Sequence, residues 1–236
     1  MTKKKADSVT YICFVRDHSG SMYSKVNQAR DNFNEQLAKL LKEDDETMDN
    51  IVTIIEFDDQ IHCNIEGRPI TEVKKLTDWW TGGMTALFDA IGYGINKVKK
   101  QYDADDREDK AVLVVVQTDG GENQSSDFEG EEGRLKIKKM IDELEATGNW
   151  TFTFLGENLD TSYAQDLGFK RGNIMAQAVK KGNEARFYAF NTNGLGDYLK
   201  SRKRGMTQTY QFYSGNDTGN MESENINITN NNKLDN

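Results

Sequence analysis

The sequence predicts an α/β fold with a doubly wound, mostly parallel central sheet, one antiparallel edge strand and helices on both faces. Continuous apolar runs of strand length alternate with segments whose apolar residues recur every three or four positions. This alternation is typical of a parallel sheet wrapped by helices. The runs lack polar alternation, as in strands covered on both faces. Two of them are separated only by a short Asp-rich turn, which predicts a hairpin and one antiparallel strand.

The first half of the chain is expected to contain three strands and two helices. Residues 10–16 (TYICFVR) form the first apolar run, and a helical stripe of apolar residues extends from Val26 to Leu40. The later elements are a hairpin of strands at 50–58 and 60–67, a less regular segment at 70–80, and a segment at 81–102 that begins as a Gly loop and becomes a helix.

The second half is expected to contain three strands and three helices. The run at 110–118 (KAVLVVVQT) carries the strongest strand signal, because five β-favouring apolar residues stand together. An amphipathic helix is expected at 183–202, where the segment NTNGLG can interrupt it. The elements between them are a helix at 131–147, a strand at 150–157, a short helix at 160–167 and a weak strand at 172–179.

We expect one folded domain at residues 9–205, since 236 residues suit one large domain or one domain with a tail. Residues 1–8 precede it as an N-terminal extension. From residue 206 the composition becomes polar and rich in Asn, without helical periodicity. Residues 206–236 are therefore expected to form a mostly disordered tail.

The chain is acidic, with a formal net charge of −9 at pH 7. Nucleic acids and anionic membranes bind clustered Lys and Arg, so we expect neither as a partner. An acidic surface instead suits the binding of a cation. No apolar run approaches the ~18 residues that span a bilayer, and the basic start lacks an apolar signal segment, so we expect a cytoplasmic location. Cys13 and Cys63 lie in strand-like runs and are expected to be buried, reduced thiols.

Oxygen-bearing side chains stand where three segments reach the carboxyl edge of the predicted sheet. Asp17, Ser19 and Ser21 follow the first strand, Thr85 precedes a helix, and Asp119 follows the strongest strand. Ligands of doubly wound sheets bind at this edge, so the five side chains are expected to converge. Residues i, i+2 and i+4 of an extended loop face the same way, which lets the first three contact one ion. Two carboxylates and three hydroxyls are hard oxygen donors that Mg²⁺ prefers, with Mn²⁺ or Ca²⁺ as alternatives.

Each part of this set has a simpler interpretation when taken alone. Asp-x-Ser-x-Ser and Asp-Gly-Gly are common polar turns, and a Thr before a helix is commonly a cap. Their coincidence favours a metal site. His18 is expected to be an exposed spacer, with a contact to a partner as the alternative. Trp79 and Trp80 fit either core packing or a contact with a partner. Glu122 and Asn123 fit a supporting or rim position. Asp58, Asp59 and residues 103–110 fit solvated surface, with a second ion site as the alternative.

Three motifs resemble those of the von Willebrand factor A domain family. DHSGS matches the family's Asp-x-Ser-x-Ser motif, GGMTALFDAI looks like its threonine loop, and VVVQTDGGEN looks like the segment with its distal aspartate. The resemblance covers roughly residues 9–200. It implies that Asp17, Ser19, Ser21, Thr85 and Asp119 form a metal-ion-dependent adhesion site (MIDAS). The later segment TFTFLGENLD is similar to intracellular bacterial and phage members of the family.

The resemblance and the donor set together favour a non-enzymatic, divalent-metal-dependent protein-binding module. The ion would keep an open position, which an Asp or Glu carboxylate of a partner protein would fill. The alternative is a metal-dependent hydrolase acting on phosphoesters, for which Glu122 is the obvious local base and Arg16 the nearest cationic clamp. The sequence has no phosphate-binding loop and no nucleophile elbow, and its two histidines offer little acid–base chemistry.

Overall fold

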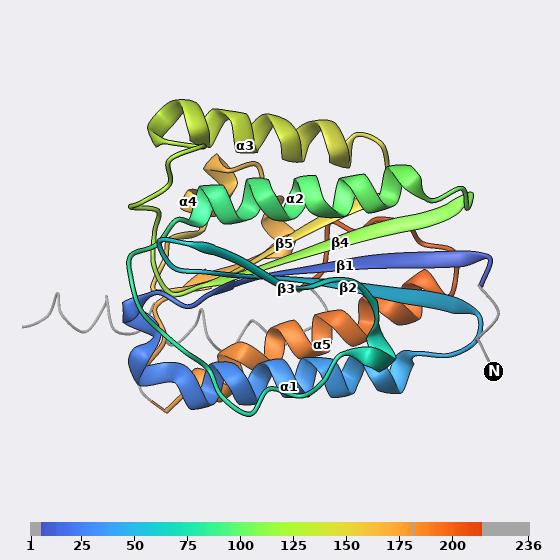
Figure 1. Ribbon diagram of the computed structural model, residues 1–236, viewed down its shortest axis with the longest axis horizontal. Helices are drawn as coiled ribbons and strands as arrows, with labels where there is room; N and C mark the ends of the chain where they lie inside the picture. The colour runs from blue at the N-terminus through green and yellow to red at the C-terminus, as the bar shows by residue number, and fades with distance from the viewer. Residues whose placement is uncertain (1–5, 181, 214–236) are drawn as a thin grey trace, which may run out of the picture.

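The computed structural model of the protein describes residues 6–180 and 182–213 (Figure 1). Its strands are β1 (Ser8–Asp17), β2 (Met48–Phe57), β3 (Ile61–Pro69), β4 (Asp109–Thr118), β5 (Trp150–Glu157) and β6 (Ile174–Gln177). They form one sheet in the order β3-β2-β1-β4-β5-β6. All neighbouring strands are parallel except β2 and β3, which pair antiparallel at one edge. The predicted fold class is confirmed.

Helices cover both faces of this sheet (Figure 1). One face carries α2 (Leu87–Ala104), α3 (Gly130–Glu145) and α4 (Thr161–Asp166), and the other carries α1 (Val26–Glu43) and α5 (Glu184–Arg202). The hydrophobic core is divided accordingly into two clusters, one on each face of the sheet. Single 3-10 turns lie at η1 (Gly20–Lys25), η2 (Ile70–Glu72) and η3 (Arg171–Asn173).

The central strands are buried on both faces, as their unbroken apolar runs predict. In β4, Val112 and Val114 belong to the core cluster under α2, while Leu113 and Val115 belong to the cluster under α1 and α5. The edge strand β3 instead alternates between half-buried and exposed residues. This difference follows from position, because an edge strand has solvent on part of its surface.

Both cysteines are free thiols, as predicted. Cys13 in β1 is fully buried, whereas Cys63 is only half-buried because it lies on the edge strand β3. The prediction of two buried thiols is therefore correct for Cys13 and wrong for Cys63.

The helix α5 runs through the NTNGLG segment without interruption. Gly194 lies against the ring of Phe212, and a Cβ at this position would clash with that ring. The glycine is therefore used for close packing inside the helix and does not end it.

Residues 206–213 lie against the domain, although the predicted tail begins at residue 206. Phe212 and Tyr213 are buried in the core cluster under α1 and α5. Asn173 fastens the segment, since its side chain donates to Thr209 O and accepts from Phe212 N. The packed chain thus continues past the predicted boundary at 205, because two aromatic side chains anchor an otherwise polar segment. The rest of the predicted tail lies outside the described residues, as do residues 1–5 of the predicted extension.

Within the described ranges, no helix combines the length and the apolar character needed to cross a bilayer. The chain leaves β1 for β2 on one side of the sheet, and β4 pairs with β1 on the other side. The strand order therefore reverses at β1. In open α/β sheets this reversal opens a crevice at the carboxyl ends of the strands, where ligands bind.

Candidate metal centre

The loop that follows β1 is held between two neighbouring segments by backbone hydrogen bonds. His18 N donates to Phe57 O at 2.7 Å, at the end of β2. Gly82 N donates to His18 O at 2.9 Å, and Gly20 N donates to Gly83 O at 3.3 Å. The Asp-x-Ser-x-Ser motif is therefore a fixed loop between the hairpin and the threonine loop.

A chain of hydrogen bonds links four of the five predicted metal ligands. Ser19 N donates to Asp17 Oδ1 at 2.7 Å, and the hydroxyls of Ser19 and Ser21 lie 3.1 Å apart. Ser21 Oγ donates to Asp119 Oδ1 at 2.6 Å. The structure thus brings together side chains from the carboxyl ends of β1 and β4, as the sequence predicts.

The Asp17 carboxylate is buried and engaged at both oxygens. Besides the bond from Ser19, Oδ2 accepts a 2.6 Å hydrogen bond from Thr118 Oγ1. Burial raises the pKa of Asp17 against the hydrogen bonds from Ser19 and Thr118, and the nearby Asp119 raises it further. Asp17 and Asp119 are two neighbouring, buried carboxylates, and they form a site whose charge a cation would relieve.

The threonine loop brings Thr85 to the same place. Asn123 holds it from both sides, since Thr85 N donates to Asn123 Oδ1 at 2.8 Å and Asn123 N donates to Thr85 O at 3.0 Å. The hydroxyl of Thr85 lies beside Gly120, the residue after Asp119, at 4.0 Å from the position a Cβ would take there. Asn123 is therefore a supporting residue, one of the two positions left open for it.

Gly83 in this loop adopts a left-handed backbone, with φ of 58°. A Cβ at this residue would clash with the side chains of Asp58 and Asp59 at the hairpin turn. Only glycine meets both conditions, so Gly83 lets the threonine loop approach the hairpin closely. Asp59 is exposed, as predicted, and Asp58 is half-buried.

A lysine lies on the acidic side of the site. Lys25 Nζ donates to Asp119 Oδ2 at 2.7 Å and lies 3.2 Å from Glu157 Oε1, at the end of β5. Burial lowers the pKa of Lys25, but the carboxylates of Asp119 and Glu157 outweigh it, and the net shift is upward. Tyr188 OH donates to the other oxygen of Glu157 at 2.8 Å. The site thus already attracts a positive charge, supplied by the chain itself.

Glu122 caps the start of α2 with its carboxylate. Its Oε2 accepts from Phe88 N and Ser125 Oγ, and its Oε1 accepts from Gln124 N and Ser125 N. These four hydrogen bonds occupy both oxygens and orient them toward the backbone of the helix and its neighbouring loop. Glu122 is therefore a supporting residue with no oxygen free to act as a base.

His18 is buried, at 1% exposure, and the prediction of an exposed spacer is wrong. Its ring stacks on Trp79 with centroids 4.2 Å apart and planes 4° apart, and its Nδ1 lies 2.8 Å from Trp80 O. Burial lowers the pKa of His18 to about 4, so the ring is neutral at pH 7. Trp79 packs against the core, whereas Trp80 remains 40% exposed. Trp79 therefore fits core packing, and a contact of Trp80 with a partner stays a prediction.

The donor chemistry fits a hard divalent cation. Among the residues that the structure describes, no group of three or more His, Cys, Asp or Glu side chains is placed to hold a metal. The predicted set has two carboxylates and three hydroxyls, and such oxygen donors suit Mg²⁺ with some waters retained. That these five residues bind a metal stays a prediction.

Sequence reasoning missed three residues that shape the site: Thr118, Lys25 and Glu157. Glu157 had a usable signal, because it is the last residue of a strand at the same sheet edge as Asp119. Thr118 also precedes a predicted ligand directly. Lys25 had no comparable signal, since a lysine at the start of a helix is commonly solvated.

No protein-family model matches the sequence, and no curated protein does. Solved structures match the fold. The pilus adhesin SpaC from Lactobacillus rhamnosus GG aligns with a TM-score of 0.61 at 14% identity, over 82% of this chain and 30% of the adhesin. Proximal thread matrix protein 1 from the mussel byssus, with a zinc-occupied MIDAS motif, aligns with a TM-score of 0.53 at 12% identity, over 80% and 48% of the two chains.

A von Willebrand factor type A structure from Catenulispora acidiphila aligns with a TM-score of 0.50 at 12% identity, over 81% of this chain and 43% of that one. The chain therefore spans about half the length of the mussel protein and less than half of the other two. Likeness at these identities concerns the fold alone. This fold is the mostly parallel sheet with one antiparallel edge strand and helices on both faces described above. The chain has the α/β fold of the von Willebrand factor A domain.

Proposed function

We propose that this protein is a non-enzymatic binding module that recognises a partner protein through a divalent cation. The cation, Mg²⁺ in the first instance with Mn²⁺ or Ca²⁺ as alternatives, would be held by Asp17, Ser19, Ser21, Thr85 and Asp119. When bound, it supplies a Lewis-acidic position that attracts a carboxylate. An Asp or Glu side chain of the partner would provide that carboxylate.

The observation that supports this most is the hydrogen-bonded chain from Asp17 through Ser19 and Ser21 to Asp119. This chain brings side chains from the ends of β1 and β4 together at the carboxyl edge of the sheet, where sheets of this kind bind ligands. Three of the five ligands are neutral hydroxyls, so the two carboxylates do not over-neutralise one divalent ion. A cation held this way retains attraction for one further anionic oxygen.

The solved structures with this fold lend support of a coarser kind. One of them carries zinc at a MIDAS motif, and another is a pilus adhesin. One of these proteins combines the fold with a metal and the other combines it with adhesion, which supports a metal-dependent adhesion or protein-interaction module. The choice of Mg²⁺ and the acidic residue of the partner are our inference from the donor set.

The alternative function, a hydrolase acting on phosphoesters, is less well supported. Metal-assisted hydrolysis needs a base that can reach the attacking water. Both oxygens of Glu122 accept backbone or hydroxyl hydrogen bonds. Arg16 extends toward α1 and pairs with Glu56. Neither residue is placed as the alternative requires.

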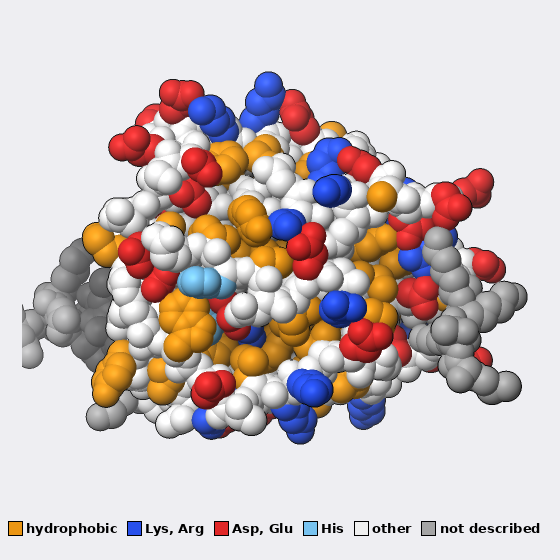
Figure 2. Space-filling view, in the orientation of Figure 1, with side chains coloured by type: hydrophobic (Ala, Val, Ile, Leu, Met, Phe, Trp, Pro, Cys, Tyr) orange, Lys and Arg blue, Asp and Glu red, His pale blue; other side chains and the backbone are white. Residues whose placement is uncertain are grey.

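The expected partners exclude nucleic acid and membrane, and the expected location is the cytoplasm. The chain carries 39 acidic and 30 basic residues. On the face shown in Figure 2, Lys and Arg side chains are mixed with Asp and Glu and do not gather in one basic patch. An acidic chain with mixed charges on this face gives little attraction to phosphate backbones there, which supports the first exclusion.

Thermal unfolding with and without Mg²⁺ tests the metal site. At a free Mg²⁺ concentration of about 100 times Kd, binding should stabilise the parent protein by about 2.7 kcal/mol. The nearly isosteric change Asp17→Asn should remove this shift, while Asp31→Asn, at an exposed carboxylate of α1, should keep it. If Mg²⁺, Mn²⁺ and Ca²⁺ all leave the parent unchanged, the metal assignment is wrong.

Partner capture tests the binding role. Proteins retained by the immobilised chain in Mg²⁺ should be released by EDTA and should not bind the Asp119→Asn variant. Partners that stay bound in EDTA and also bind this variant would contradict recognition through a metal. Turnover of a phosphoester substrate by the Mg²⁺-loaded chain would favour the alternative function.

A further inference from the structure

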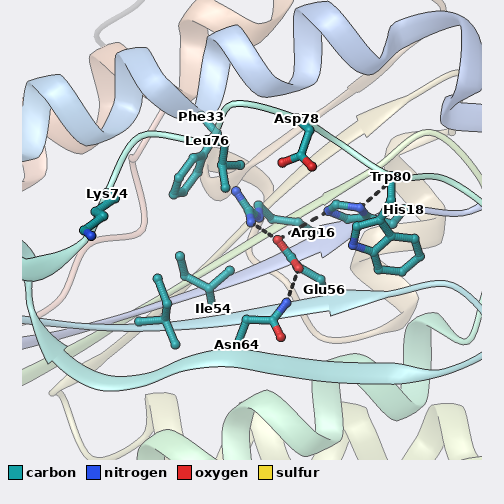
Figure 3. A pocket seen from close by; sticks show the side chains of 11 residues that line it. Arg16, His18, Phe33, Ile54, Glu56, Asn64, Lys74, Leu76, Asp78 and Trp80 are labelled. Carbon is teal, nitrogen blue, oxygen red and sulfur yellow. Dashed lines mark hydrogen bonds and ion pairs between the residues drawn. The ribbon is translucent and has the colours of Figure 1, made fainter.

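A second site lies on the α1 side of the sheet, close to the edge strand. A cavity of about 210 Å³ opens there between β1, β2, β3, α1 and the segment that leads to Trp80. We call it the Arg16 cavity (Figure 3). Arg16 and Asp17 are successive residues of β1, so their side chains leave the strand on opposite faces. The cavity is therefore separate from the candidate metal centre.

Arg16 is a buried cation with most of its donors unused. Its side chain is 3% exposed, and its guanidinium lies 4.0 Å from the ring centroid of Phe33 and 4.9 Å from that of Trp79. One nitrogen, Nη2, donates to Glu56 Oε1. Nε and Nη1 are buried without a hydrogen-bond partner among the described residues. Buried polar groups in proteins are almost always paired, so two unpaired donors on one cation call for a missing acceptor.

The surroundings of Arg16 provide donors but few free acceptors. Trp79 Nε1 is also buried without a partner in the described part of the chain. Glu56 already accepts from Arg16 at Oε1 and from Asn64 Nδ2 at Oε2, the latter at 2.5 Å. His18 Nδ1 carries its hydrogen because it faces the carbonyl oxygen of Trp80, which leaves Nε2 as an acceptor without a hydrogen-bond partner among the described residues. The unpaired donors, Arg16 Nε and Nη1 and Trp79 Nε1, outnumber this one acceptor. The complement of this arrangement is a ligand that brings acceptor oxygens.

The size and walls of the cavity restrict that ligand further. Its volume of about 210 Å³ corresponds to roughly seven waters at ~30 Å³ each. Sites for drug-sized ligands typically measure about 300–1,000 Å³, so this cavity suits a smaller molecule. Apolar wall is contributed by Phe33, Ile54, Ile65, Leu76 and Trp80. The charged lining consists of Arg16 with its partner Glu56 and of the exposed Lys74 and Asp78. The site thus offers the unused guanidinium donors of Arg16 and a short apolar chamber.

We propose that the Arg16 cavity binds a small monocarboxylic acid with a short branched or aromatic body. The carboxylate accepts hydrogen bonds from the unused Arg16 nitrogens. The apolar body lies against Leu76 and Trp80, whose side chains border the cavity in Figure 3. A charge-assisted pair to a guanidinium is stronger than a neutral hydrogen bond, so the site should select the acid over its neutral analogues.

The test follows the indole NMR signals of the tryptophans during titration with a ligand. 3-Methylbutanoate is titrated into the ¹⁵N-labelled full chain without divalent metal, and 3-methylbutanamide and 3-methylbutanol are the neutral controls. The chain has three tryptophans. We expect the indole signals of Trp79 and Trp80 to shift in a saturable way, while that of Trp150, in the core cluster of the opposite face, stays in place. A Kd of about 1 mM is the order expected for so few atoms.

Two variants separate the anion anchor from the chamber. Arg16→Gln should weaken binding of the acid by at least about tenfold. Because this change also disturbs Glu56, a second variant, Leu76→Phe, narrows the chamber without touching the guanidinium. Leu76→Phe should abolish saturable shifts, and Leu135→Phe, at an exposed leucine of α3, should leave them unchanged.

Three results would overturn the proposal. Equal binding of the acid, the amide and the alcohol would remove the role of Arg16 as an anion anchor. Unchanged binding in Leu76→Phe would place the ligand elsewhere on the chain. Absence of saturable shifts in the parent protein would mean that the cavity holds water alone. Since the titration contains no divalent metal, each result is independent of the proposed metal-dependent function.

Discussion

The two ends of the sheet differ in how their buried arginines are hydrogen-bonded. At the amino ends of the strands, Arg107 and Arg202 each donate from all three guanidinium nitrogens. At the carboxyl end of β1, Arg16 donates from one. Arg107 bonds to Asp105, to Asp49 at 2.7 Å and to Ala6 O. These contacts join the starts of β1 and β2 to the chain before β4. A saturated arginine fixes the backbone around it, and an unsaturated one keeps capacity for a ligand.

The carboxylates differ between the two ends in the same way. At the amino ends, arginine lowers the pKa of Asp105, and hydrogen bonds from Ser8 and Arg202 lower that of Asp109 against its burial. At the carboxyl end, burial raises the pKa of Asp17 although two hydroxyl-bearing residues bond to it. Charges at the amino ends are therefore compensated within the chain, while those at the carboxyl end still favour an added cation. Three substitutions test this contrast.

Arg202→Met should cause the largest loss of stability. Its guanidinium is fully buried and bonds to Thr10 Oγ1 at 3.1 Å, Met206 O at 3.0 Å and Asp109 Oδ1 at 2.8 Å. Breaking a buried ion pair costs about 3–5 kcal/mol, and we expect about 3 kcal/mol because the stranded carboxylate can hydrate. Asp109 is 41% exposed at its side chain. The free energy of unfolding in urea measures the loss.

The matched control is Arg204→Met, at an exposed arginine whose guanidinium donates to Ser201 Oγ. It should stay within about 0.5 kcal/mol of the parent. If Arg202→Met costs no more than this control, saturation of a guanidinium does not distinguish the two ends of the sheet.

Lys25→Met tests the carboxyl end, where a side chain supplies the compensating charge. Removing the ammonium from Asp119 should raise Mg²⁺ affinity about tenfold, or 1.4 kcal/mol, because a cation no longer competes for the carboxylate. The Mg²⁺-free protein should lose about 1 kcal/mol of stability, since Asp119 and Glu157 then face each other uncompensated. Calorimetric titration with Mg²⁺ and unfolding in EDTA measure the two effects.

Lys42→Met, at an exposed lysine in the last turn of α1, controls for the loss of one surface charge and should change neither quantity. Weaker Mg²⁺ binding in Lys25→Met would contradict the prediction. It would mean that Lys25 orients Asp119 for the ion and does not oppose it.

The elements of the fold could be predicted because their signals are local. Unbroken apolar runs and three- or four-residue periodicity identify β1, β4 and α1 without any knowledge of their neighbours. Predictions failed where burial depends on residues that are distant in the sequence. His18 is buried because two rings about 60 residues later cover it: Trp79 stacks on it, and Trp80 lies tilted against it. In the segment after residue 205, a polar composition concealed two anchoring aromatics, Phe212 and Tyr213.

The site was predictable to the same extent. Asp17, Ser19 and Ser21 follow one strand at alternating positions, so their convergence with Asp119 required only the fold class. Lys25 enters the site through a hydrogen bond that spans 94 positions, to Asp119. Periodicity carries no signal for such a contact, and neither does composition. The Arg16 cavity was invisible for a related reason, since it is bounded by side chains from five separate segments.

The smallest expected effect belongs to Asp45, an amino-end carboxylate that is paired but exposed. Hydrogen bonds from Lys203 and Thr47 lower its pKa from the ordinary 3.8 to about 2. A lowered folded-state pKa adds stability that is fully present above pH 3.8 and is lost as the pH falls toward 2. Because the Asp45 side chain is 41% exposed, solvent screening limits this contribution to about 0.5 kcal/mol or less. Asp45→Asn should therefore lower stability only slightly at pH 7, and still less at pH 2, where the folded-state carboxyl is half protonated. Urea unfolding at both pH values measures this. A loss at pH 7 as large as that of Arg202→Met would show that exposed pairs fasten the amino ends as firmly as saturated, buried arginines do.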